Sequence, residues 1–121
     1  MSNQPLKLSG LYDVPINWTG ASGWPHRMTL HLLGTAFRAV PGVYIFCFPN
    51  AEGYWVPVYI GQAESLKDRL TDRLASHHQW ESIKACGATH VCTMLVEGGL
   101  AKRLEIETDL RHAFKTPCNL Q

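Results

Sequence analysis

The sequence lacks a long apolar segment. No hydrophobic run in the 121-residue chain approaches the roughly 20 residues that a membrane-spanning helix needs. The N-terminal region also lacks the basic start and apolar stretch of a secretory signal. We therefore expect a cytoplasmic protein, and the length fits a single domain.

The chain also lacks an excess of charge of either sign. Eleven Lys and Arg residues stand against ten Asp and Glu residues, which gives a formal net charge of +1. Proteins that bind nucleic acids usually show a basic excess, so the overall composition points to no partner. Any basic surface has to be local. The candidates for it lie on the two main predicted helices: Lys67, Arg69, Arg73, Lys102, Arg103, Arg111 and Lys115.

The four cysteines lack the Cys-x-x-Cys spacing of a metal or redox centre. Cys47, Cys86, Cys92 and Cys118 are therefore expected to be reduced and to act as small apolar residues. A zinc site built from Cys86, Cys92, His90 and a distant histidine is the alternative. Its spacing does not match that of a closed zinc site.

Residues 1–40 differ from the rest of the chain because prolines and glycines punctuate them. We expect an N-terminal arm, rich in loops, that packs on the domain formed by residues 41–121. Residues 27–40 have some helical character. Trp18 and Trp24 are expected to be buried against this arm, although an aromatic platform for nucleotide bases is the alternative.

From residue 41 onwards the hydrophobic pattern is clearer. Residues 42–48 are rich in β-branched and aromatic side chains, and they form a predicted hairpin with residues 55–60, where Pro57 suggests an edge strand or an irregularity. Ser65 and Asp68 fit a capping box that opens a helix running to about residue 78. The remaining predicted elements are a short helix at 79–85, a strand at 89–96 and a helix at 100–115. The predicted fold class is therefore α/β of the α+β kind: a small three-stranded, mainly antiparallel sheet flanked by helices, in the order β-β-α-α-β-α.

Two tyrosines are candidates for a shared site on this hairpin. In the simplest register Tyr44 lies directly opposite Tyr59, and opposed residues on paired strands point to the same face. Tyrosine also favours strands for structural reasons, and a slip of one residue would separate the two phenols. The pair alone is therefore a weak indication of function.

The last predicted helix carries a carboxylate on its apolar side. At about 100° per residue, Glu107 falls within the arc of Leu104, Ile106 and Leu110. A buried carboxylate is costly unless it is paired or binds a metal ion. Arg103 and Arg111 lie four residues to either side, so a structural ion pair is the alternative.

These residues together resemble the GIY-YIG endonuclease family. The resemblance covers about residues 41–121, and its order and spacing agree at each motif. The motifs are Gly42-Val43-Tyr44, Tyr59-Ile60-Gly61-Gln62-Ala63, Leu66 with Arg69, Glu107-x-x-Leu110, and Pro117-x-Asn119.

The resemblance implies a metal-dependent endonuclease that hydrolyses a phosphodiester bond in DNA. Glu107 would be the protein ligand of one Mg²⁺ ion, for which Mn²⁺ is able to substitute. Arg69 would hold the scissile phosphate, Tyr44 would help take a proton from the attacking water, and Tyr59 would orient water or phosphate. Lys67 belongs to the local basic surface, Gly61 leaves room at the turn, and Asn119 braces the site.

One position departs from the family pattern. Many members have a histidine or tyrosine four residues after the arginine, where this chain has Arg73, which cannot act as a base. His77 is then the candidate base, with His78 as its rival, and Arg73 competes with Arg69 for the phosphate. A binding module without the reaction, and a nuclease subunit that depends on a protein partner for targeting, are the alternative functions.

Overall fold

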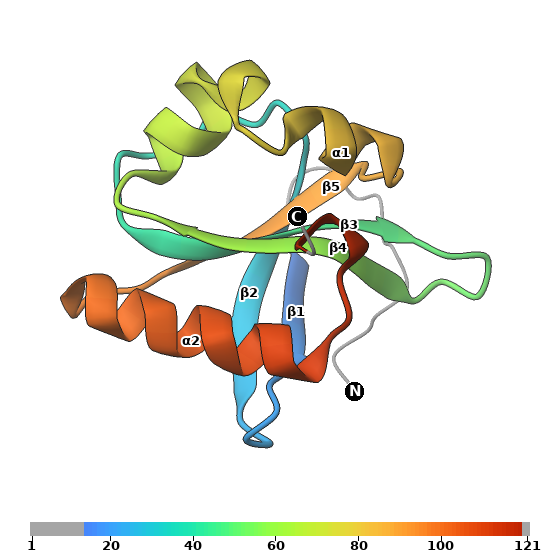
Figure 1. The fold of residues 1–121 in the computed structure, drawn as a ribbon, viewed down its shortest axis with the longest axis horizontal. Coiled ribbons are helices and arrows are strands. Elements are labelled where there is room, and N and C mark those ends of the chain that lie inside the picture. The colour runs from blue at the N-terminus through green and yellow to red at the C-terminus, as the bar shows by residue number, and fades with distance from the viewer. Residues whose placement is uncertain (1–13, 120–121) are drawn as a thin grey trace.

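The protein is built on one antiparallel sheet of five strands. The computed structural model describes residues 14–119. The strands lie in the order β1-β2-β5-β3-β4 across the sheet, and every neighbouring pair is antiparallel. Figure 1 shows this curled sheet between its helices. The strands are β1 (Val14–Thr19), β2 (Pro25–Leu32), β3 (Gly42–Pro49), β4 (Trp55–Ala63) and β5 (His90–Leu95).

The prediction of a three-stranded sheet is wrong, because residues 14–32 supply two further strands. They form a hairpin whose second strand, β2, pairs with β5 through contacts such as Thr29 with Thr93. Side chains of β2 alternate between buried and exposed, as a half-covered strand requires. The helical character expected for residues 27–40 is therefore wrong up to Leu32, because residues 25–32 form strand β2. Trp18 is buried as expected, but Trp24 is 68% exposed.

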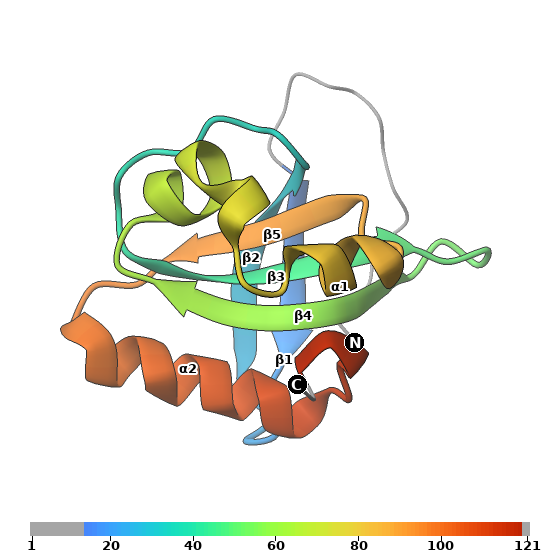
Figure 2. The ribbon, with the colours of Figure 1, turned by 45° about the horizontal axis from the view of Figure 1, so that its top comes forward.

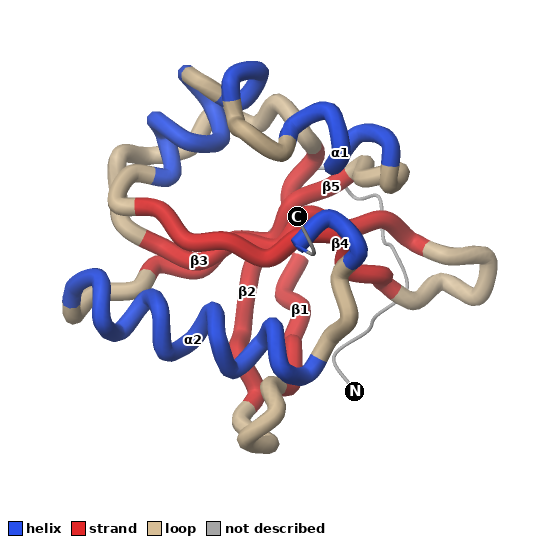
Figure 3. The backbone as a smooth tube through the Cα atoms, viewed as in Figure 1, coloured by secondary structure: helices blue, strands red, loops and turns tan. Residues whose placement is uncertain are grey.

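Helical segments cover the sheet on two sides (Figures 2 and 3). The long helix α2 (Gly99–Ala113) packs on one face. A π-helical turn η1 (Asp68–Asp72), a 3₁₀ turn η2 (Leu74–Ser76) and the short helix α1 (Trp80–Ala85) cover the other. A last 3₁₀ turn, η3 (Pro117–Asn119), lies against β4. No helix of the described residues is long and apolar enough to cross a membrane.

The segment after β4 is not the continuous helix that the sequence predicts. The hydroxyl of Ser65 accepts a bond of 3.2 Å from the backbone N–H of Asp68, which is one half of the expected capping box. The chain then makes a π-helical turn and breaks at Arg73, whose φ of −126° and ψ of 29° are not helical. This break changes the direction of the residues that follow, including His77.

The interior strand β3, between β5 and β4, is buried on both faces, which places a tyrosine inside the protein. Val43, Ile45 and Cys47 belong to the core beneath α2, whereas Tyr44 and Phe46 belong to the core beneath η1 and α1. All five side chains are fully buried. The alternation of a strand thus directs Tyr44 to the face that also receives the η1 segment.

Candidate functional site

Tyr44 and Tyr59 lie on one face of the sheet, although their register differs from the predicted one. Tyr44 pairs with Gly61 rather than with Tyr59, and Tyr59 pairs with Phe46. The shift is two residues, so both rings still point to the same face. The rings stack with centroids 6.2 Å apart. Within the β3–β4 pair the register shifts once, between Phe46 and Cys47, which agrees with the irregularity that Pro57 suggested. β4 is an edge strand of the sheet.

Gly61 leaves the space in which the Tyr44 ring lies. A Cβ atom at Gly61 would be 2.6 Å from both Cζ and Oη of Tyr44, and 3.0 Å from Cε1 of Tyr59. Carbon atoms do not approach so closely without displacement. The glycine of the second motif is therefore required by the position of the first motif's tyrosine.

His77 is hydrogen-bonded to the Tyr44 phenol. Its Nε2 lies 2.9 Å from Oη of Tyr44, and the imidazole is buried. Its Nδ1 accepts a bond of 3.1 Å from the backbone N–H of Gln79. Because Nδ1 is the acceptor, the neutral ring carries its proton on Nε2 and donates to Tyr44. Burial, followed by the charge of Arg69, lowers the pKa of His77 to about 4, so the ring is neutral at pH 7. The rival, His78, is exposed and stacks on His77.

Arg69 reaches the tyrosine, whereas Arg73 does not. Nη1 of Arg69 donates to Oη of Tyr44 over 3.4 Å. Arg73 instead forms an exposed ion pair of 3.3 Å with Asp68. A cavity of about 380 Å³ opens beside Arg69, with space for a small anion. Its lining residues are Ala63, Glu64, Ser65, Asp68 and Arg69.

The electrostatics of Tyr44 differ from the expected ones. Burial raises its pKa above the ordinary value, and the neighbouring Tyr59 raises it further. Arg69 acts in the opposite direction but does not overcome burial. The phenol is therefore protonated in the protein by itself. Since its oxygen accepts bonds from His77 and Arg69, its own proton is free to point to a third partner.

Glu107 is a half-buried carboxylate without an ion pair among the described residues. Burial raises its pKa, and the charge of Arg111 partly offsets this. The charge of Glu107 in turn raises the pKa of Tyr59, after the larger effect of burial. The structural ion pair with Arg103 or Arg111 that the sequence left open does not form. Arg103 bonds to Gln62, and Arg111 bonds to the carbonyl of Asn119.

The C-terminal segment closes the outer edge of β4 through one side chain. The Asn119 carboxamide accepts a bond of 2.7 Å from the N–H of Ile60 and donates a bond of 2.9 Å to its carbonyl. It also accepts a bond of 2.6 Å from the Thr116 hydroxyl. The amide thus pairs with the edge strand as another strand would. Because Ile60 lies between Tyr59 and Gly61, Asn119 holds the part of β4 that carries both.

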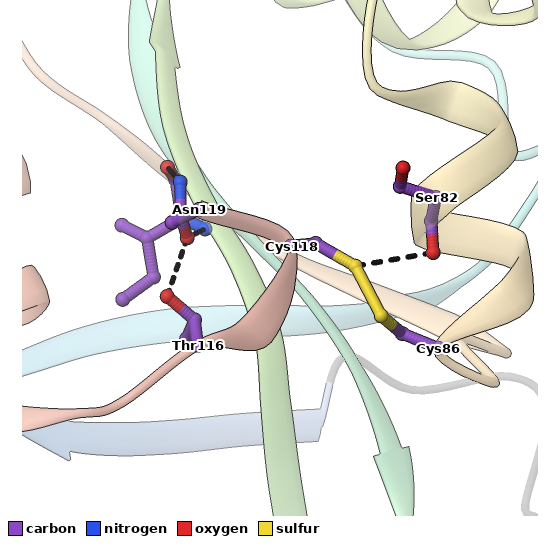
Figure 4. Close-up of a disulfide and its surroundings, with 6 residues drawn as sticks. Ser82, Cys86, Thr116, Cys118 and Asn119 are labelled. Atoms are coloured by element: carbon purple, nitrogen blue, oxygen red, sulfur yellow. Dashed lines mark hydrogen bonds between the residues drawn. A yellow bond between two sulfur atoms is a disulfide. The ribbon is translucent and has the colours of Figure 1, made fainter. Parts of the chain in front are cut away.

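A disulfide bond joins this segment to α1, which corrects the expectation that every cysteine is reduced. Cys118 is bonded to Cys86, 32 residues away in the sequence (Figure 4). The Cys118 sulfur also lies 3.1 Å from the carbonyl oxygen of Ser82. Cys47 and Cys92 are free and buried. The described residues hold no cluster of three or more His, Cys, Asp or Glu side chains that would form a zinc site.

Three of the seven residues of the predicted basic surface have acidic partners among the described residues. Lys67 pairs with Asp72 at 2.6 Å, and Lys102 pairs with Glu105 at 2.8 Å, in addition to the pairing of Arg73. The structure also buries Arg103, which the sequence analysis treated only as a surface residue or an ion-pair partner. The same 100° spacing that identified Glu107 places Arg103 in the apolar arc, so the pattern contained this information.

A larger groove of about 740 Å³ lies between α2 and the β1–β2 turn and contains none of the predicted catalytic residues. Asp109 accounts for the local structure there. Its carboxylate accepts bonds from the backbone N–H and the hydroxyl of Ser22, and lies 2.8 Å from Nε2 of His26. These contacts fasten the hairpin turn to α2.

Comparisons of the chain with protein-family models, with curated proteins and with solved structures find no match. The site must therefore be interpreted from its own geometry. It brings together Tyr44, His77 and Arg69, with Tyr59 and Glu107 beside them.

Proposed function

We propose that the protein is a GIY-YIG-type endonuclease that hydrolyses phosphodiester bonds in DNA with one Mg²⁺ ion. The observation that carries this proposal is the meeting of Tyr44, Tyr59, Arg69 and His77 on one face of the sheet, where the charge of Glu107 also acts. Tyr44 accepts hydrogen bonds from both His77 and Arg69, next to Tyr59 and an unpaired, half-buried Glu107. A structural core does not require this combination of groups.

The residues fit a hydrated magnesium ion. Glu107 is desolvated and has no cationic partner among the described residues, so a cation would relieve the cost of its burial. A single carboxylate suits Mg²⁺, because this ion keeps most of its water ligands and shares phosphate oxygens. When bound, the ion, or Mn²⁺ in its place, supplies positive charge that neutralises phosphate oxygens and favours ionisation of nearby groups.

Arg69 is the residue that would hold the scissile phosphate. Its guanidinium lies beside a cavity and presents several N–H donors in a planar fork, which matches phosphate oxygens. Its charge remains in place as negative charge grows on the phosphate. Arg73 is paired with Asp68 on the surface and has no such position.

Tyr44 would orient the attacking water and accept its proton once additional positive charge favours the phenolate. We assign His77 a different role from that of the candidate base. Its Nε2–H donates to the Tyr44 oxygen while Gln79 occupies Nδ1, so the ring has no free site for a proton. His77 therefore stabilises negative charge on Tyr44 as a hydrogen-bond donor. Tyr59, whose ring stacks on Tyr44, would orient water or phosphate.

The test is nicking of supercoiled plasmid with Mg²⁺, with EDTA as a control. We expect cleavage by the wild-type protein, and its loss in Glu107→Gln and Arg69→Ala. Arg73→Ala is the matched control, because it removes an arginine from the same segment without touching Tyr44. Loss of cleavage in Arg73→Ala but not in Arg69→Ala would contradict the site assignment.

A partner-dependent nuclease subunit, or a binding module without the reaction, is the second candidate. The observation that favours it is the pairing of Lys67, Arg73 and Lys102 with acidic neighbours, which reduces the positive charge available for DNA. A folded wild-type protein that neither cleaves nor binds DNA alone would support the subunit. Binding that weakens with salt, without cleavage, would support the binding module.

A further inference from the structure

Arg103 presents a charge that no acidic group of residues 14–119 balances. Its side chain comes from α2 and is only 8% exposed. Its Nε donates a bond of 2.8 Å to the carboxamide oxygen of Gln62, which is neutral. No ion pair of the described residues includes Arg103, and no other partner of its guanidinium is found among them. A buried charge without a counter-charge is costly, and such groups are usually paired or bind a ligand.

The nearby carboxylates do not supply the missing counter-charge. Glu105 is paired with Lys102 on the surface. Glu107 lies one helical turn further along α2, and Arg111, not Arg103, is the arginine whose charge lowers its pKa. Among residues 14–119, the guanidinium therefore has N–H donors left over for a ligand.

The position of Arg103 suggests which ligand its guanidinium binds. It lies four residues before Glu107, so the two side chains leave α2 on neighbouring parts of one face. Its partner Gln62 follows Gly61 on β4, which passes over the Tyr44 ring. Arg103 thus lies at the same edge as the proposed site, on the α2 side, whereas Arg69 approaches from the η1 side.

We propose that Arg103 binds a second phosphate of the substrate strand, next to the scissile phosphate, and so sets the register of the strand. This inference rests on the proposed function. The planar guanidinium uses Nε for Gln62 and leaves both Nη groups for phosphate oxygens, an arrangement that lysine cannot reproduce. Binding of this phosphate supplies a counter-charge, which none of the described acidic side chains provides.

The competing explanation is that Arg103 only braces β4 against α2 through Gln62. The two explanations differ for Gln62→Met, which removes the carboxamide at similar volume but leaves the arginine. If Arg103 is a brace, Gln62→Met and Arg103→Gln should have the same effect. If it binds phosphate, only Arg103→Gln should remove a contact with DNA.

The experiment measures binding of duplex DNA by fluorescence anisotropy at several salt concentrations, in a Glu107→Gln background that prevents cleavage. We expect Arg103→Gln to bind about tenfold more weakly, because a charge-assisted hydrogen bond is lost. Its slope of log affinity against log salt should fall by about one phosphate contact. Gln62→Met should keep the slope of the parent, and Arg103→Lys should keep the slope with reduced affinity.

Circular dichroism and thermal unfolding establish that each variant is folded. If Arg103→Gln does not fold, the decisive comparison is Arg103→Lys, which should lose affinity while Gln62→Met does not. A folded Arg103→Gln with the parent's affinity and slope overturns the inference and leaves the proposed function standing. A folded parent without DNA binding at any salt concentration overturns both.

Discussion

Replacing Gly61 by alanine should displace Tyr44 and disconnect it from His77. The new Cβ would lie 2.6 Å from the Tyr44 ring, whereas ordinary contacts begin at 3.4 Å, so the ring has to move by about 0.8 Å. Tyr44 is fully buried, and its 2.9 Å bond to His77 cannot survive such a shift unchanged. We expect a loss of stability of about 1–3 kcal/mol from overpacking. Misplacement of a reacting group by this distance should lower the rate of nicking about 100-fold.

Two assays check this prediction, and one does not depend on the proposed reaction. The Nε2–H proton of His77, followed by NMR, should exchange faster with solvent, because its hydrogen bond to Tyr44 Oη is lost. Plasmid nicking measures the effect on rate. The control is Gly42→Ala, whose Cβ would meet the Met94 carbonyl and lie 2.9 Å from Leu66 Cδ1, far from the Tyr44 hydroxyl. It should cost stability but keep the slow exchange of the His77 Nε2–H proton. A wild-type exchange rate and wild-type nicking in Gly61→Ala would refute the reasoning.

Three further predictions concern the surroundings of the site. The pKa of His77 is lowered to about 4 in the folded protein, so between pH 6.5 and 4 the unfolded chain binds more protons than the folded one. The free energy of unfolding should therefore fall as the pH falls through this window. Urea unfolding measures this, and His77→Gln should show a flatter dependence of that free energy on pH. Reduction of the Cys86–Cys118 bond, which closes a loop of 32 residues, should lower the free energy of unfolding by about 4 kcal/mol. Thermal unfolding with and without a thiol reductant measures this, and an equal effect of the reductant on Cys118→Ser would contradict it. Asn119→Ala removes two hydrogen bonds to Ile60 and should lower the free energy of unfolding in denaturant by about 2 kcal/mol. The amide hydrogen of Ile60 should also exchange faster. An unchanged exchange rate would show that Asn119 does not protect the edge of β4.

Much of the second half of the fold follows from local patterns. The predicted strands at 42–48, 55–60 and 89–96 coincide closely with β3, β4 and β5, and the last helix ends two residues earlier than expected. These elements have continuous apolar or alternating patterns, which report burial directly. The hairpin of residues 14–32 was missed because its prolines and glycines resemble a loop. Pro15 lies on an edge strand and Pro25 begins β2, which are positions where a sheet tolerates proline.

The site shows the same division between local and long-range information. The sequence by itself determined the chemical inventory: two tyrosines on paired strands, arginines and a histidine after β4, and a carboxylate on the apolar side of α2. It determined these because side-chain periodicity in strands and helices is a local property. It also placed Glu107 partly inside, through the 100° spacing of a helix.

Only the tertiary structure decided which of these groups meet. The π-helical turn and the break at Arg73 carry His77 to Tyr44 and leave Arg73 at the surface, a result that regular helical spacing does not give. The disulfide bond joins residues 32 positions apart, and the pairing of β2 with β5 joins residues further apart still. Contacts of this kind depend on the packing of whole elements, because their free energy comes from surfaces that approach one another only in the folded chain.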